Sequence, residues 1–193
     1  MKVYDLNGIE KPLTWLYATY GQGVQIQPPP DGSTPLYHIV ELRESEGPAT
    51  FYVTVLDEHG APLSSAPVVF YWPDAPINPD LGHLGRGVIG LTSPIGRAEF
   101  AVGRGSYYNP TSQAGPHAAW ISGSVSERIQ GLGMLPGTNH RHLDVTIQKK
   151  PQDDGTGNQP PDLQGTILLG LEVIIAILQE ISAVIRTLNV LNP

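Results

Sequence analysis

Cysteine is absent from the 193 residues of this chain, and charged residues are scarce. Without cysteine the chain can form no disulfide, thiolate metal site or Fe–S cluster, and it has no cysteine nucleophile. Charged residues make up 15% of the sequence, against a typical ~25%, and the formal net charge is −7. Lys and Arg form no cluster, so we expect no nucleic-acid partner, because phosphate binding relies on grouped positive charge.

Two further signals are missing from the sequence. The first residues, MKVYDLNGIEKPLTW, have no apolar stretch before Asp5, which is unlike a secretory signal peptide. This leaves the localisation open between the cytoplasm and release by another route, as in a virion or appendage protein. The G-x-S-x-G motif of serine hydrolases does not occur, and the glycines at 131, 133 and 137 precede no expected helix that could bind a phosphate. We therefore expect no enzymatic activity, no catalytic residue and no cofactor.

Glycine and proline are abundant instead. The 22 glycines and 19 prolines amount to about 21% of the chain, against a usual ~12%, and this density of turn residues disfavours a helical bundle. Short β-branched and aromatic runs separated by turn residues are typical of a β-sandwich. The sequence predicts a mainly β domain over residues 1–148, with nine strands near residues 2–5, 24–27, 37–43, 50–56, 68–72, 87–92, 97–102, 117–122 and 143–148.

Two turns in this region predict β-hairpins. The first joins residues 50–56 to 68–72 and contains Asp57 and Gly60, since Asp starts such turns and Gly supplies a positive φ. The second joins residues 87–92 to 97–102 through Pro94 and Gly96. Residues 14–20, TWLYATY, fit a short helix capped by Thr14 and a strand equally well.

The sequence changes character after residue 148. Residues 149–165, KKPQDDGTGNQPPDLQG, have almost no apolar side chain and predict a flexible linker. Residues 166–193 predict a helix with apolar residues at heptad spacing. Its a and d positions are Ile167, Gly170, Ile174, Ile177, Ile181, Val184, Leu188 and Leu191, and Leu171, Leu178 and Ile185 at position e widen the apolar stripe.

Three uses compete for this helix: self-association, docking onto the chain's own sandwich, and membrane insertion. Glu172, Glu180 and Arg186 oppose insertion, since each costs roughly 2.5–3.5 kcal/mol near the centre of a membrane helix. Polar side chains at position f, opposite the apolar stripe, indicate a protein interface, and Ile-rich a and d positions favour a trimer or a larger assembly. We expect homo-oligomerisation, with a glycan or cell-surface partner for the sandwich as the second candidate.

The stretch VTVLDEHGAPLSSAPVVFYW, followed by GLTSPIGRAEFAV, resembles the signature of bacterial Ig-like and carboxypeptidase-regulatory-like (transthyretin-like) domains. The resemblance covers about 50 residues and implies a β-sandwich, and such domains serve as adhesion, spacer and carbohydrate-associated modules. It assigns no functional residue. The residues that carry it are Val55, Asp57, Gly60, Pro62, Val68, Phe70, Thr92, Gly96, Ala98 and Phe100.

Residues 139–144, NHRHLD, offer the only His-x-His pair. His140, His142 and Asp144 would share one face of a strand, where two histidines can chelate zinc. Alternation places Leu143 inside and the polar side chains outside, so we expect a solvated polar face and no metal site.

Aromatic side chains provide the better signal for a ligand, because exposed rings stack on sugar faces. Tyr107 and Tyr108 lie in the polar stretch RGSYYNPTSQ and are the predicted exposed pair. The other rings that we considered are Trp15, Tyr17, Tyr20, Tyr71, Trp72 and Trp120. The expected function is a non-enzymatic structural or display module, with a carbohydrate-binding module and a membrane-tethered adhesion domain as alternatives.

Overall fold

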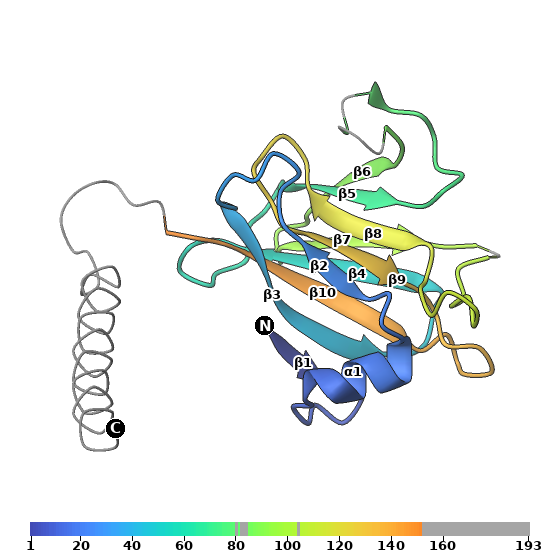
Figure 1. Cartoon of the computed structure of the whole chain (residues 1–193). Coiled ribbons are helices and arrows are strands. Elements are labelled where there is room, and N and C mark those ends of the chain that lie inside the picture. Colours follow the sequence, from blue (N-terminus) through green and yellow to red (C-terminus); the bar gives the residue numbers. More distant parts are fainter. Residues whose placement is uncertain (80, 82–84, 104, 152–193) are drawn as a thin grey trace, which may run out of the picture. The chain divides into compact units, whose positions relative to one another are not determined.

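A computed structural model of the chain describes residues 1–151, except 80, 82–84 and 104. This part belongs to one compact unit, Met1–Gln152, built from two five-stranded sheets and one short helix (Figure 1). The mainly β prediction is confirmed, and two packed sheets are consistent with a β-sandwich. The predicted helix 166–193 lies outside the described residues, as does the predicted linker beyond Pro151.

The first sheet, sheet A, has the strand order β1-β3-β10-β4-β7. Its last strand in sequence, β10, is central: it pairs antiparallel with β3 and parallel with β4. The bounds are β1 Lys2–Tyr4, β3 Tyr37–Ser45, β4 Thr50–Leu56, β7 Arg97–Ala101 and β10 His142–Lys149.

The second sheet, sheet B, has the order β2-β9-β8-β5-β6, with antiparallel pairs throughout. The bounds are β2 Gln25–Gln27, β5 Pro67–Tyr71, β6 Val88–Leu91, β8 His117–Ile121 and β9 Arg128–Leu132. All nine predicted strands are present, and their ends lie within two residues of the prediction. Strand β9 is a tenth strand that was not predicted.

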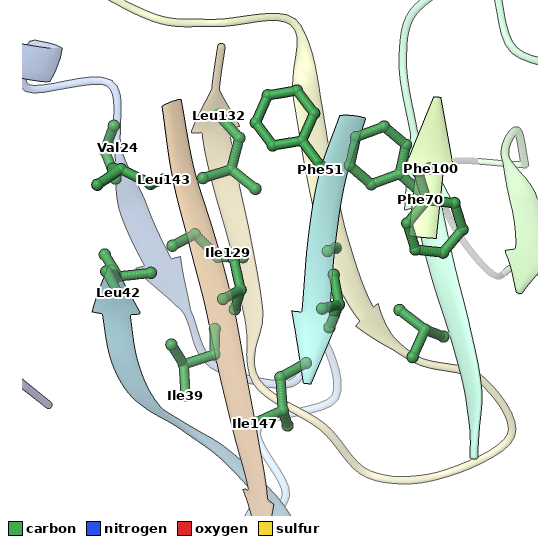
Figure 2. Packing of buried hydrophobic residues seen from close by; sticks show 14 of the residues in the cluster. Val24, Ile39, Leu42, Phe51, Phe70, Phe100, Ile129, Leu132, Leu143 and Ile147 are labelled. Atoms are coloured by element: carbon green, nitrogen blue, oxygen red, sulfur yellow. The ribbon is translucent and has the colours of Figure 1, made fainter. Parts of the chain in front are cut away.

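The hydrophobic core fills the space between the two sheets. Alternate residues of the central strands point inward, as the period of two requires, and Leu143, Val145 and Ile147 of β10 are all buried as predicted. Figure 2 shows side chains of both sheets interleaved, with Phe51 and Phe100 of sheet A beside Phe70 of sheet B. The rings of Phe70 and Phe100 stack at 4.7 Å between centroids and join the sheets at this end.

Both predicted hairpins are wrong, although both turns exist. Asp57 accepts hydrogen bonds from the N–H groups of His59 and Ala61 and so forms the predicted turn, but β4 lies in sheet A and β5 in sheet B. The turn at Gly96 likewise connects β6 of sheet B to β7 of sheet A. Each turn therefore crosses from one sheet to the other, as connections in sandwiches do.

Residues 13–20 form the helix α1, Leu13–Tyr20, at the foot of sheet A near β1 and β3 (Figure 1). Thr14 lies inside the helix and does not cap it. The N-cap is Pro12, and its side chain forms no capping hydrogen bond. Leu16 and Tyr20, four residues apart, form the buried side of the helix. The Tyr20 hydroxyl donates to the buried Glu44 carboxylate of β3 at 2.8 Å, which ties the helix to sheet A.

Candidate functional site

The two sheets present very different outer surfaces. Ion pairs cover the outer surface of sheet A, among them Glu41 with Arg43 at 3.0 Å and Glu99 with Arg97 at 3.1 Å. The five strands of sheet B contain no Asp, Glu or Lys, and Arg128 is their one strongly basic residue. The outer surface of sheet B therefore has few charges: amides and half-buried aromatic rings lie on β2, β5, β8 and β9, and the apolar Ile89 and Leu91 are exposed on β6.

Strand register places these side chains in rows across sheet B. Tyr71 of β5 is paired with Ala118 of β8, Ala118 with Gln130 of β9, and Gln130 with Gln25 of β2. In the neighbouring row Trp120 of β8 is opposite Val69, and Arg128 of β9 is opposite Gln27. We call the outward residues Tyr71, Ala118, Trp120, Arg128, Gln130, Gln25 and Gln27 the aromatic-amide face.

Contacts hold several of these side chains in position. The Arg128 guanidinium lies over the Trp120 ring at 5.9 Å from its centroid, close enough for a cation–π interaction. Burial lowers the pKa of Arg128 while the nearby Tyr71 opposes this shift, and a guanidinium stays charged at neutral pH. The Gln27 amide donates to the Gln25 side-chain oxygen at 2.9 Å. Several side chains of the face are therefore held in place by contacts with one another.

Two hollows open on this face. One, of about 400 Å³, lies at Trp120 and Arg128 and also has Pro29, Leu81, Ser122 and Ser124 in its lining. The other, of about 380 Å³, lies at Tyr71 and has Ala118, Gln130 and Gln25 in its lining. Both volumes fall in the ~300–1,000 Å³ range of small-molecule sites. A small residue at Ala118, between the larger Tyr71 and Gln130, leaves room for the second hollow.

His117 lies at the end of the sandwich, where it lines the Tyr71 hollow and a further pocket of about 410 Å³ beside Trp72. Its ring stacks on Phe70 at 4.9 Å and contacts Phe51 at 5.2 Å. Neither ring nitrogen has a partner with hydrogen-bond geometry among the described residues. Burial lowers the pKa of His117 to about 4, although the nearby Tyr71 carbonyl favours the charged form. The ring is therefore neutral at physiological pH and serves mainly as a core side chain.

The NHRHLD segment does not form the solvated face that the alternation predicts. Strand β10 begins only at His142, and His140 before it has a φ of 50° and bonds the Gly47 carbonyl. His142 is 1% exposed and contacts the Phe51 ring edge-on at 4.8 Å. The prediction failed for His140 because it precedes the strand, and for His142 because its ring packs against the core ring of Phe51 although alternation with Leu143 predicts an outward side chain.

His142 and Asp144 form a partly buried pair instead. The ring Nε2 lies 3.2 Å from Asp144 Oδ1, and Nδ1 lies 2.6 Å from the His140 carbonyl oxygen. Burial alone would lower the pKa of His142, but these two acceptors outweigh burial and raise it. Asp144 also accepts from the Tyr52 N–H at 3.0 Å. Among the described residues no group of three or more His, Asp or Glu side chains is placed to hold a metal ion.

The two tyrosines predicted as an exposed pair differ in burial. Tyr107 is 41% exposed, as predicted, whereas Tyr108 is 9% exposed and packs on Tyr20 at 5.8 Å. Burial raises the pKa of Tyr108. Only Tyr107 therefore presents a ring from this loop. The predicted oligomerisation residues, from Ile167 to Leu191, lie beyond the described part of the chain.

The aromatic-amide face was missed as a site, although Trp120 was among the rings considered. Its signal is present in the sequence: QIQ at 25–27 and the alternation around Trp120 both place polar or aromatic side chains opposite core residues. What the sequence could not show is that β2, β8 and β9 are neighbours. Within the described residues, no helix has the length and hydrophobicity of a membrane span.

Comparisons with protein-family models, with curated proteins and with solved structures found no match to this chain. The similarity to Ig-like and transthyretin-like domains therefore stays a prediction from the motif alone.

Proposed function

We propose that this chain is a non-enzymatic display module, which self-associates through residues 166–193 and presents its β-sandwich for assembly or for recognition of a surface. The observation that carries the proposal is the heptad pattern from Ile167 to Leu191, which follows a linker-like segment and a sandwich with its own core. An apolar stripe of this length needs a partner surface, because a single helix cannot bury it alone.

Assembly would change how strongly the sandwich binds. A flexible linker lets several sandwiches reach one surface, and linked sites can gain roughly 10²–10⁴ in avidity without any new contact. A weak site on each sandwich would then suffice. Display of a weakly binding module is the use that best combines the three segments.

Light scattering of the full chain over a concentration series tests the proposal. We expect a discrete oligomer, and we expect the double variant Ile177→Asn/Ile181→Asn to have the mass of a single chain, since buried Asn side chains oppose the apolar seam. The matched control is Glu172→Asn/Gln179→Asn at position f, which should keep the oligomer. A monomeric parent chain would overturn self-association, and a parent that needs detergent to stay in solution would favour the membrane-tethered alternative.

A carbohydrate-binding module is the second candidate function. The aromatic-amide face favours it, because planar rings and amides are the groups that pack on sugar rings and bond their hydroxyls. This function would not depend on residues 166–193, so saturable glycan binding by the Ile177→Asn/Ile181→Asn variant would distinguish it from display alone.

A further inference from the structure

We infer that the aromatic-amide face of sheet B binds a neutral, extended oligosaccharide lying across the strands, with one sugar on Trp120 and the chain continuing over Gln130. The inference deepens the proposed function by naming what the sandwich recognises. It uses a different part of the chain from the assembly, so each can fail without the other.

The chemistry of the face selects the ligand class. A sugar ring offers a C–H face, which packs on an aromatic ring, and an edge of hydroxyls, which both donate and accept hydrogen bonds. Trp120 and Tyr71 supply rings, and Gln25 and Gln130 supply amides that donate and accept equally. A charged ligand would find few complements here, because Arg128 and Asp31, which have opposite charges, are the only Asp, Glu, Lys or Arg residues among the described residues that line the two hollows.

The dimensions of the face suit a chain rather than a single sugar. The row from Tyr71 through Ala118 and Gln130 to Gln25 crosses four strands, which spans about 14 Å at ordinary strand spacing. Hollows of about 400 and 380 Å³ adjoin the two rings. A ligand of several sugar units could occupy both hollows at once.

The lining of the Trp120 hollow includes further polar residues. Ser122 and Ser124 are among them, and a serine hydroxyl can both donate and accept a hydrogen bond. Asp31 also lines this hollow, and hydrogen bonds from Ser33 lower the pKa of its carboxyl, which keeps it ionised as an acceptor. The Arg128 guanidinium at 5.9 Å from the Trp120 ring contributes donors on the same side.

Isothermal titration of the full chain with cellohexaose, xylohexaose, mannohexaose and chitohexaose tests the inference. Soluble hexasaccharides occupy one sandwich at a time, so avidity does not affect the result. We expect at least one of them to bind with a Kd below about 1 mM, and Trp120→Ala to weaken that binding at least about tenfold. Gln130→Ala should also weaken the binding of that hexasaccharide. Because this variant removes an amide and no core side chain, it keeps the test interpretable if Trp120→Ala does not fold.

Sheet A offers a matched control. Tyr52 carries the Arg97 guanidinium over its ring at 4.4 Å, the same kind of pair on the opposite outer surface. Tyr52→Ala should leave the affinity unchanged. If none of the hexasaccharides binds, the inference is overturned. The proposed assembly is tested separately, and an oligomer seen by light scattering would still support it. Loss of binding in Tyr107→Ala with none in Trp120→Ala or Gln130→Ala would also overturn it.

Discussion

Phe51 contacts two buried histidines whose pKa values are shifted in opposite directions. His117 has no hydrogen-bonded acceptor, and burial lowers its pKa to about 4. His142 has acceptors at both nitrogens, and its pKa is raised. Burial lowers the pKa of both rings, so the presence of acceptors decides the direction of each shift.

The pH dependence of the free energy of unfolding should distinguish the two histidines. The native pKa of His117 lies below the unfolded value of 6.5, so its contribution is complete above pH 6.5 and is lost as the pH falls towards 4, by up to about 3 kcal/mol. The variant His117→Phe should lack this part of the acid destabilisation. Urea unfolding of both proteins at several pH values between 4 and 7.5 measures the difference.

His142→Phe is the control, because the contribution of His142 to stability should depend on pH with the opposite sign. A raised native pKa gives stability that is present below the unfolded pKa and is lost as the pH rises through the native one. The parent chain should therefore lose its advantage over His142→Phe on going from pH 6 to pH 8. Equal pH dependence of both variants and the parent would contradict the opposite directions of the two pKa shifts.

At the level of single elements, two glycines with similar φ angles should lose different amounts of stability when they are replaced by alanine. Gly96 has a φ of 72°, and a Cβ there would lie 2.7 Å from the Val55 carbonyl oxygen. Gly123 has a φ of 65° with nothing within 4 Å of its Cβ. Gly123→Ala should cost about 1 kcal/mol through the positive φ alone, and Gly96→Ala clearly more, because the turn between β6 and β7 must also shift. Urea unfolding at pH 7.5 compares the two, and equal losses would contradict a clash at Gly96.

The elements themselves were largely predictable, because alternation and turn residues are local signals. The strand β9 escaped notice because Gly131 interrupts its pattern: the register of β8 against β9 shifts there, and Gly131 has a φ of 80°. The pairing of strands was not predictable in the same way. The turns at Asp57 and Gly96 look like hairpins in sequence, and only the whole arrangement shows that each crosses between sheets. The candidate site was missed for the same reason, since it combines four strands, of which β2 and β5 are distant in sequence from β8 and β9.

For the whole molecule, the central place of β10 predicts a sharp limit to truncation. This strand pairs with β3 and β4 and supplies Leu143, Val145 and Ile147 to the core. A chain that ends at residue 141 would leave β3 and β4 each without a partner on one side and remove three buried side chains, so it should be unfolded. A chain that ends at Pro151 should keep the two-sheet fold. Circular dichroism and amide hydrogen exchange distinguish the two, and a folded 1–141 chain would contradict the central role of β10.

The same strand determines how the sandwich would bear a pulling force. A load transmitted along the chain beyond Pro151 enters at the Lys149 end of β10, a strand with hydrogen-bonded neighbours on both sides. Tension along this strand stresses its two ladders in shear, so many backbone bonds share the load and must break together. An edge strand such as β6, pulled sideways, would instead open one bond at a time. Because the chain leaves from the central strand of sheet A, this sandwich should resist unfolding when it is pulled from that end.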